Sequence, residues 1–375
     1  MNEKRKIQNR DQSPINEGSL PREILTAMIE PLSVWYAENK KPLPWRASGD
    51  PYHIWLSEIK LQQTRTTAVI PYYHRFVETL PTVEALAEVD SGTLMKLWEG
   101  LGYYSRARNL KAAAIRVVED HGGRLPADYN ALLSLPGIGE YTAGAIGSIA
   151  FGLPRPAVDG NVLRVIMRLC GCEWDVAASS TKKAVTEALA DVYPSGDAAS
   201  VLTQAIMELG ENICIPNGRP RCMDCPLSPL CQGLAKNTAE ELPRKSPKKP
   251  RRILKKTVLM IEFCDKIVIR RRPEKGLLAG LWEFPCLDGQ MSADEALAWA
   301  RREGLFPIDC SPCGNAVHVF THVEWHMSGL RLSLAALPTE HTAATPDELT
   351  NTFAIPKAFA FFKEEWLKKI RSSNA

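Results

Sequence analysis

The sequence lacks several features that would define whole classes of protein. It has no apolar run of about 18 residues, the length that a membrane-spanning helix needs. Residues 1–18 carry acids and contain no apolar stretch, so neither a secretory signal nor an Arg-rich transit peptide is indicated. We find no internal repeat, which excludes a repeat architecture. With 45% hydrophobic and 24% charged residues, the composition is that of a soluble globular protein.

A large excess of charge of one sign is also missing. The 46 basic and 43 acidic residues leave a net charge of +3, which favours no particular partner. The charge is nevertheless uneven, because eight basic and no acidic residues lie between Arg244 and Lys256, interrupted by Pro247 and Pro250. Such a segment cannot bury apolar surface, so we expect an extended linker. It is either a solubilising hinge or a strand that lies along a polyanion.

The chain of 375 residues is too long for one ordinary core, and its pattern changes at the basic segment. Before it, apolar residues recur at helical spacing over 24–36, 85–98 and 112–118. After it, a helical stretch at 292–303 lies among β-rich runs. These runs cover 258–263, 267–270, 316–320 and 330–334. We therefore expect an all-α N-terminal domain and a smaller α+β C-terminal domain.

Ten cysteines in a chain without export features predict reduced thiols rather than disulfides. Four of them are closely spaced in the pattern C-x7-C-x2-C-x5-C: Cys214, Cys222, Cys225 and Cys231. Soft sulfur ligands select iron–sulfur clusters or zinc. Structural zinc usually uses two close cysteine pairs and only one is present, so the spacing favours a [4Fe–4S] cluster, with zinc as the alternative.

A glycine-rich turn, Leu135-Pro-Gly-Ile-Gly139, opens onto a helix rich in alanine and glycine. Gly137 and Gly139 would expose backbone N–H groups at the helix N-terminus, which suits an anion such as phosphate. Gly-x-Gly alone also fits tight helix packing. The full pattern is typical of the helix–hairpin–helix, which binds the DNA backbone without reading sequence.

Two carboxylates stand in contexts that allow two interpretations. Asp159 lies in the apolar stretch Ala157–Val162, where an unpaired buried carboxylate would be costly. It is either functional or the N-cap of the following helix, and both can hold together. Glu58 lies inside an amphipathic helix, and its spacing alone is more typical of a solvated residue.

These features together resemble one family. The family-like stretches are LPWR at 43–46, LSEIKLQQT at 56–64, GLGYYSRARNL at 100–110, AVDGNVLRV at 157–165 and LAGLWEFP at 278–285. They look like the MutY-type adenine DNA glycosylases of the helix–hairpin–helix, or endonuclease III, superfamily. The resemblance covers roughly residues 22 to 365.

The resemblance implies roles for the two carboxylates. Glu58 matches the acid that protonates adenine at N7, and Asp159 matches the group that stabilises the sugar cation. Asn161 and Tyr141 match residues that support it. Adenine leaves poorly as an anion and the remaining sugar is oxocarbenium-like, so two carboxylates are needed. Whether Asp159 also forms a transient covalent sugar adduct stays open.

Tyr141 separates two subfamilies. The bifunctional relatives carry a lysine at this position, whose amine forms a Schiff base with the sugar. Because the chain has tyrosine there, the resemblance implies a monofunctional glycosylase without β-lyase activity.

Flipping adenine out of the duplex costs a few kcal/mol, and wedge residues that fill the gap offset this cost. Gln63 and Tyr103, with Leu101 beside it, match the intercalating residues of the family. Without the motif, Tyr103 and Tyr104 would be interpreted as an aromatic core pair. The residues that match positions lining the adenine pocket are Trp45, Arg46, Leu61 and Gln204.

The C-terminal domain resembles the MutT-like, Nudix-fold module of these enzymes. A working Nudix hydrolase needs a glutamate-rich R-E-x-x-E-E-x-G helix to hold divalent metal, but residues 300–305 have arginines there. The domain is therefore expected to read the opposite base rather than to hydrolyse nucleotides. Phe320, Thr321 and His322 correspond to the loop that inspects 8-oxoguanine, and the alternative for Phe320 is the end of a buried strand.

The chain departs from the family at three places. The first cysteine gap has seven residues where six are usual, Thr321 stands where serine is common, and Lys60 stands where many relatives have methionine. The hydroxyl of Thr321 preserves the reading group. Lys60 is expected to face either phosphate or solvent.

The sequence thus predicts a monomeric adenine glycosylase that acts on double-stranded DNA with adenine opposite 8-oxoguanine or guanine. Its rivals are a bifunctional glycosylase/lyase, a non-catalytic damage-binding protein and a nucleotide-pool hydrolase. We expect no membrane association, and a cytoplasmic, nucleoid-associated protein if the source is bacterial. The expected segments are a disordered tail (1–20), the helical domain (21–233), the linker (234–256) and the MutT-like domain (257–370).

Overall fold

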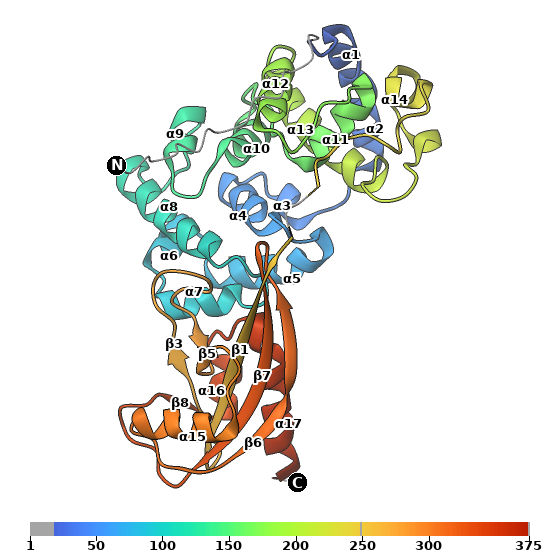
Figure 1. Ribbon diagram of the computed structural model, residues 1–375. Coiled ribbons are helices and arrows are strands. Elements are labelled where there is room, and N and C mark those ends of the chain that lie inside the picture. Colours follow the sequence, from blue (N-terminus) through green and yellow to red (C-terminus); the bar gives the residue numbers. More distant parts are fainter. Residues whose placement is uncertain (1–18, 248–249, 374–375) are drawn as a thin grey trace, which may run out of the picture. The chain divides into compact units, whose positions relative to one another are not determined.

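The computed structural model describes residues 19–247 and 250–373 (Figure 1). All but two residues of the predicted tail therefore lie outside the described part. The chain divides into two compact units, residues 1–59 with 124–247 and residues 60–123 with 248–375, which we call the first and second units. No described helix is long and apolar enough to cross a membrane.

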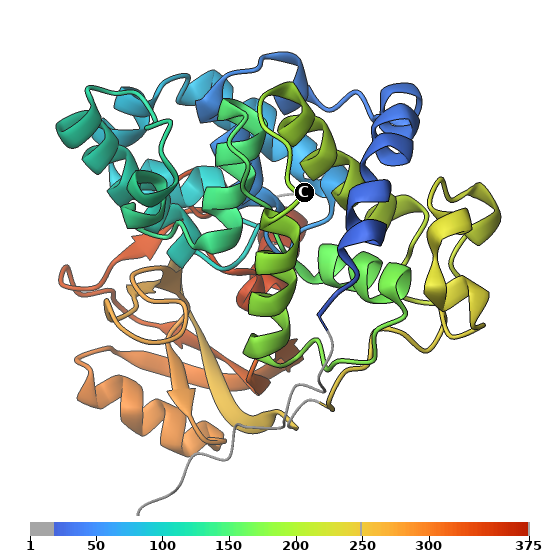
Figure 2. The ribbon, with the colours of Figure 1, turned by 90° about the horizontal axis from the view of Figure 1, so that it is seen from above.

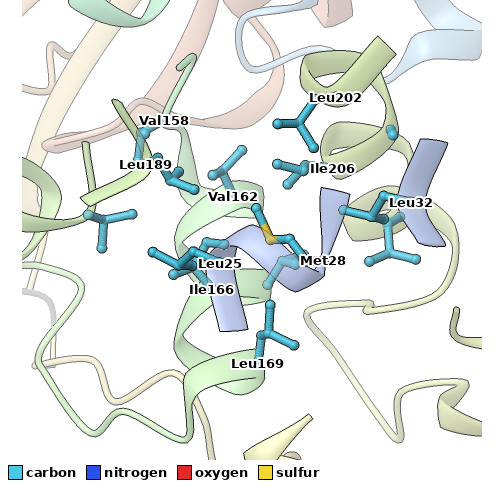
Figure 3. Close-up of a cluster of buried hydrophobic side chains, with 14 of the residues drawn as sticks. Leu25, Met28, Leu32, Val158, Val162, Ile166, Leu169, Leu189, Leu202 and Ile206 are labelled. Carbon is cyan, nitrogen blue, oxygen red and sulfur yellow. The ribbon is translucent and has the colours of Figure 1, made fainter. Parts of the chain in front are cut away.

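The first unit is helical. Its helices are α1 (Arg22–Ala27), α2 (Ile29–Asn39), α3 (Pro44–Ala47), α4 (Pro51–Leu61, whose last two residues belong to the second unit), α9 (Tyr129–Ser134), α10 (Glu140–Phe151), α11 (Gly160–Cys170), α12 (Ser179–Ala190), α13 (Asp197–Asn212) and α14 (Gln232–Ala235), with the 3-10 turns η1 (Cys222–Asp224) and η2 (Ser228–Leu230). Figure 3 shows apolar side chains of α1, α2, α11, α12 and α13 packed together. Val162, Ile166 and Leu169 recur on one face of α11, as helical periodicity requires.

A close backbone contact positions the segment that precedes α11. A Cβ atom at Gly144 in α10 would lie 2.4 Å from the carbonyl oxygen of Pro156. Only glycine permits this approach, because any side chain would displace the loop. The contact brings the start of α11, and therefore Asp159, next to α10.

The second unit contains further helices and all the strands. Its elements are α5 (Thr66–Thr79), α6 (Val83–Glu88), α7 (Ser91–Trp98), α8 (Ser105–His121), β1 (Arg252–Phe263), β2 (Lys266–Val268), β3 (Arg270–Arg271), β4 (Trp282–Glu283), β5 (Cys286–Asp288), α15 (Ala293–Arg302), β6 (Pro307–Val319), β7 (Val323–Leu334), β8 (Ala343–Ala344), α16 (Pro346–Asn351), η3 (Lys357–Phe359) and α17 (Ala360–Ser373). Thr82 and Asp90 cap α6 and α7, because their side chains accept hydrogen bonds from the first-turn amides.

The main sheet has the strand order β6-β7-β1-β2-β8, and β5 also pairs with β1. β1 and β7 are parallel, whereas the other pairs are antiparallel. Successive residues of β1 point to opposite faces. Val258 and Met260 pack with α17, whereas Leu259 and Ile261 pack with α15, which lies beside the strands in Figures 1 and 2. The predicted all-α and α+β fold class is confirmed.

Both ends of the basic segment have defined backbone contacts in the structure. The Val176 N–H donates to the Arg244 carbonyl over 3.0 Å, so the chain up to this point is held on the first unit. β1 begins at Arg252, and residues 252–256 are therefore strand. β-Forming side chains at Ile253 and Leu254 explain why the strand extends into a basic stretch.

Candidate active site

Glu58 lies in α4 and is only 6% exposed, so it is not the solvated residue that its spacing alone suggests. The Tyr141 hydroxyl, from the first turn of α10, donates to Glu58 Oε2 over 3.0 Å. Burial raises the pKa of Glu58 to about 7, the bond from Tyr141 opposes the rise, and the charge of Asp159 adds to it. A carboxyl with this pKa can deliver a proton near neutral pH.

Asp159 is the N-cap of α11, as the structural interpretation of its motif predicts. Its Oδ1 accepts from the backbone N–H groups of Asn161 and Val162, both over 2.8 Å. Its Oδ2 accepts from the Asn161 side-chain amide over 3.0 Å. Burial raises the pKa of Asp159 above its usual value, and these hydrogen bonds limit the rise. The capping bonds also fix the orientation of the carboxylate, so capping does not exclude a functional role.

A buried arginine, Arg164, holds the side chain of Asn161 in place. Arg164 Nη2 donates to Asn161 Oδ1 over 3.0 Å and to the Gly210 carbonyl over 2.8 Å. Its Nε donates to the Cys214 carbonyl over 2.8 Å. One guanidinium therefore joins the support of Asp159 to the backbone of the first closely spaced cysteine.

Three residues predicted to line the pocket lie in the first unit. Trp45 is buried, and Arg46 Nη1 forms an ion pair with Glu208 Oε2 over 2.7 Å. Gln204 Oε1 accepts from the Tyr36 hydroxyl over 3.0 Å. Sequence reasoning missed Glu208 and Tyr36 as polar partners of this site. The signal for Glu208 was an acid within the apolar stretch of α13.

The predicted helix–hairpin–helix consists of α9, the turn 135–139 and α10. Gly137 has φ +75°, a conformation that other residues rarely adopt. Gly139, the N-cap of α10, is exposed and has no side chain with which to cap the helix. The N-terminus of this twelve-residue helix is therefore suited to an anion.

The four closely spaced cysteines line one pocket of about 320 Å³, part of it open to solvent. Arg168 Nη1 lies 3.3 Å from the sulfur of Cys214. The chain turns back on itself between Cys214 and Cys222. Gly218 has φ +79°, and the Arg221 N–H donates to the Ile213 carbonyl over 3.0 Å. Within the described residues, no group of three or more His, Cys, Asp or Glu is placed so that it could hold a metal ion.

The predicted wedge residues lie in the second unit. Gln63 and Tyr103 have φ values of +61° and +47°, and such left-handed backbone costs about 1–2 kcal/mol per residue. Tyr103 is 49% exposed, and its hydroxyl donates to Gln63 Oε1 over 3.1 Å. Tyr104 is buried, so the core-pair interpretation fits only this second tyrosine, and Leu101 is buried as well. Leu61 is the half-buried last residue of α4.

Phe320, Thr321 and His322 form the tight connection between β6 and β7. The Phe320 N–H donates to the Val323 carbonyl over 2.8 Å, and the Phe320 ring lies 4.9 Å from that of Trp325. Phe320 thus anchors the turn. Thr321 and His322 are exposed, and Thr321 Oγ1 lies 3.1 Å from the Tyr103 hydroxyl.

Lys60 faces neither phosphate nor solvent, contrary to the expectation. It is 0% exposed, and its Nζ has no hydrogen-bond partner among the residues that the structure describes. The amine lies 4.0 Å from the ring centroid of Phe76 and 4.3 Å from that of Trp98. Burial, with the charges of Arg106 and Arg75, holds the pKa of Lys60 well below its usual value.

Comparison with known protein families assigns two regions of the chain. Residues 56–195 match the HhH-GPD superfamily of base excision DNA repair proteins, and residues 257–364 match the NUDIX domain. A thermostable thymine-DNA glycosylase has a TM-score of 0.50 and 29% identity, over 57% of this chain and 98% of that one. An endonuclease III–DNA covalent intermediate has the same TM-score and 25% identity, over 58% and 99%. The fold and site therefore define a helix–hairpin–helix base excision repair enzyme with a Nudix-like domain.

Curated relatives narrow the assignment. Human adenine DNA glycosylase is 33% identical in an alignment 373 positions long, which covers 82% of this chain and 67% of the human protein. The adenine DNA glycosylase of Buchnera aphidicola subsp. Acyrthosiphon pisum is 30% identical over 303 residues, 80% of this chain and 85% of that protein. The chain belongs to the adenine DNA glycosylase family, which confirms the predicted enzyme class.

Proposed function

We propose that the protein hydrolyses the N-glycosidic bond of adenine mispaired with 8-oxoguanine or guanine in double-stranded DNA. The observation that carries the proposal is the pairing of a buried, protonatable Glu58 with an oriented Asp159. These are the two groups that the departure of a poor leaving base requires. The membership of the adenine DNA glycosylase family supports adenine as the base.

In this proposal Glu58 protonates adenine at N7 as the bond breaks. Tyr141 has a pKa raised well above its usual value by burial, so its hydroxyl stays neutral and holds Glu58 in place. The negative charge of Asp159, held by the amides of α11, stabilises the oxocarbenium-like sugar until water attacks. No amine stands at position 141, so the reaction ends at the abasic site.

The four cysteines would hold a [4Fe–4S] cluster. Thiolate is the donor that such clusters take, and all four sulfurs line one pocket. Structural zinc usually uses two close cysteine pairs and this loop has one, so the spacing favours the cluster. When bound, the cluster supplies iron–sulfur bonds that cross-link the loop 214–231.

The DNA interface would use three further features. The N-terminus of α10 binds the backbone, Gln63 and Tyr103 fill the gap left by the flipped adenine, and the turn 320–322 reads the opposite base. Thr321 provides the hydroxyl for that reading. The Nudix-like domain acts as a reader, because exposed Arg301 and Arg302 end α15 where metal-binding glutamates would be needed. The enzyme acts as a monomer.

A single-turnover assay tests the proposal on duplexes with adenine opposite 8-oxoguanine, guanine or thymine. We expect adenine release opposite 8-oxoguanine and guanine, and a loss of at least 100-fold in Glu58→Gln because the proton donor is gone. Glu38→Gln removes an exposed acid of α2 and serves as the matched control. Undiminished release by Glu58→Gln would refute the mechanism, and strand nicking without heat or base would favour a lyase.

A further inference from the structure

Arg106, in the first turn of α8, joins two separate loops of the second unit. It is 9% exposed, and its guanidinium donates four hydrogen bonds to backbone carbonyls. Nη1 donates to Lys60 over 3.1 Å and to Gln62 over 2.7 Å. Nη2 donates to Leu101 and to Gly102, both over 3.2 Å. One planar group therefore binds the end of α4 and the connection between α7 and α8.

Each of these loops carries one exposed residue in left-handed backbone beside the guanidinium. Gln63 follows the bonded carbonyl of Gln62, and Tyr103 follows that of Gly102. Strained conformations persist only where the surroundings over-determine them. The rigid fork of an arginine fixes several acceptors at once, which the single ammonium of a lysine cannot do.

The guanidinium is itself held in place. Its carbon lies 5.3 Å from the ring centroid of Trp98 and 5.7 Å from that of Tyr103. Trp98 Nε1 donates to the Gly102 carbonyl over 3.1 Å, which fixes the same loop a second time. Burial lowers the pKa of Arg106 to about 10, so the group keeps its charge at neutral pH.

We propose that Arg106 is a positioning residue that fixes the loops of Gln63 and Tyr103 as one preformed DNA wedge. The inference rests on the proposed function, in which these two side chains fill the gap left by adenine. The hydrogen bond from the Tyr103 hydroxyl to Gln63 joins the two side chains. Arg106 joins the backbone of the two loops that carry them. The wedge then enters the duplex without first having to order its loops, so less of the binding free energy is lost.

Arg106→Lys tests the proposal because it keeps the charge and loses the fork. Arg116→Lys, an exposed arginine on the same helix, is the matched control. The probe is a duplex with 2-aminopurine beside an adenine·8-oxoguanine mispair, since its fluorescence rises when stacking is lost. In Arg106→Lys we expect at least a fivefold smaller rise and at least tenfold slower adenine release. Affinity for undamaged duplex should stay close to wild type when it is measured below the Tm of the variant, which the lost hydrogen bonds lower.

The outcomes separate the wedge from the proposed function. If the wild type releases no adenine, the proposed function fails. If the wild type is active and Arg106→Lys matches it in fluorescence and rate, the role of Arg106 is overturned.

If Arg106→Lys does not fold, exposed residues decide instead. A double-mutant cycle uses Gln63→Ala, Tyr103→Ala and the double variant. If the two side chains act as one wedge, the double variant loses rate of adenine release to within threefold of the larger single loss. Losses that multiply would show two independent side chains and would refute the proposal.

Discussion

At the scale of single residues, the site depends on the opposed influences on one carboxyl. Burial raises the pKa of Glu58 and the bond from Tyr141 opposes the rise, which leaves the pKa at about 7. Asp159 is buried too, but it accepts three hydrogen bonds, so its negative form is the better solvated of the two. The two environments therefore favour an acid and an anion side by side.

The pH dependence of adenine release follows from this difference. Only protonated Glu58 acts as the acid, so the single-turnover rate should fall about tenfold per pH unit above pH 7. Tyr141→Phe removes a hydrogen bond that lowers the pKa of Glu58. The pKa then rises, and the fall in rate should move to higher pH. Rates measured from pH 6 to 9 check this expectation.

Tyr129→Phe is the control for that experiment, because Tyr129 is a half-buried tyrosine with no hydrogen bond to Glu58. It should leave the profile unchanged. A profile of Tyr141→Phe that shifts to lower pH, or stays in place, would show that Glu58 is not the titrating acid.

At the scale of secondary structure, the sequence predicted elements wherever one periodicity dominates. Regular apolar spacing indicated the helices near 85–98 and 112–118, and the β-rich run at 258–263 indicated the centre of β1. The first part of β6 was missed because prolines and polar residues interrupt its apolar ones. It is an edge strand whose register shifts at Pro307 and Pro312, which is where a strand tolerates proline.

Side-chain surroundings were harder to predict than elements. Family motifs indicated Glu58 and Asp159, but not the burial that raises the pKa of each. Tyr36 and Glu208 escaped notice because their partners lie 168 and 162 residues away in the chain. Such contacts depend on how helices pack: a local pattern, such as the acid within the apolar stretch of α13, indicates a special position but not the partner. The same holds for Lys60, whose surroundings come from α5 and α7.

The contacts of Lys60 with Phe76 and Trp98 yield a stability prediction. A buried amine without a hydrogen bond costs about 2–7 kcal/mol, and a desolvated cation–π contact returns about 2 kcal/mol. Lys60→Met fills a similar volume with an apolar chain. We expect it to raise the free energy of unfolding by about 1–3 kcal/mol at pH 7, measured by urea denaturation.

The sign of the pH dependence provides an internal check. The pKa of Lys60 is lowered in the folded state, so the unfolded state binds more protons between that pKa and about 10.4. Wild-type stability should therefore rise with pH across this window, and Lys60→Met should lack that contribution. Lys183→Met, at an exposed position, should change neither quantity. A less stable Lys60→Met would mean that the rings of Phe76 and Trp98 stabilise the ammonium group.

At the scale of the whole molecule, charge matters by position rather than by sum. The net charge of +3 is small, yet eight basic residues lie together between Arg244 and Lys256. The structure describes this segment except at Lys248 and Lys249. Arg251 Nε donates to the Phe320 carbonyl over 3.1 Å, so part of the charge is already committed to the turn 320–322. Arg244 and Lys256 are likewise paired, with Glu241 and Asp288, so the candidates for phosphate contacts are the other basic residues of the segment.

Neutralising these residues should weaken duplex binding in a salt-dependent way. Each phosphate contact contributes about 0.9 to the slope of log affinity against log salt, so Lys245→Gln, Lys248→Gln and Lys249→Gln together should reduce the slope by about 2 to 3. A control with equal charge loss changes Lys40, Lys183 and Lys368, all exposed. Titrations from 50 to about 300 mM salt measure both variants.

Because phosphate contacts carry no sequence information, the preference for 8-oxoguanine over guanine opposite adenine should stay within about twofold of wild type. An equal slope change in both triple variants would assign the effect to total charge, and an unchanged slope would make the segment a hinge.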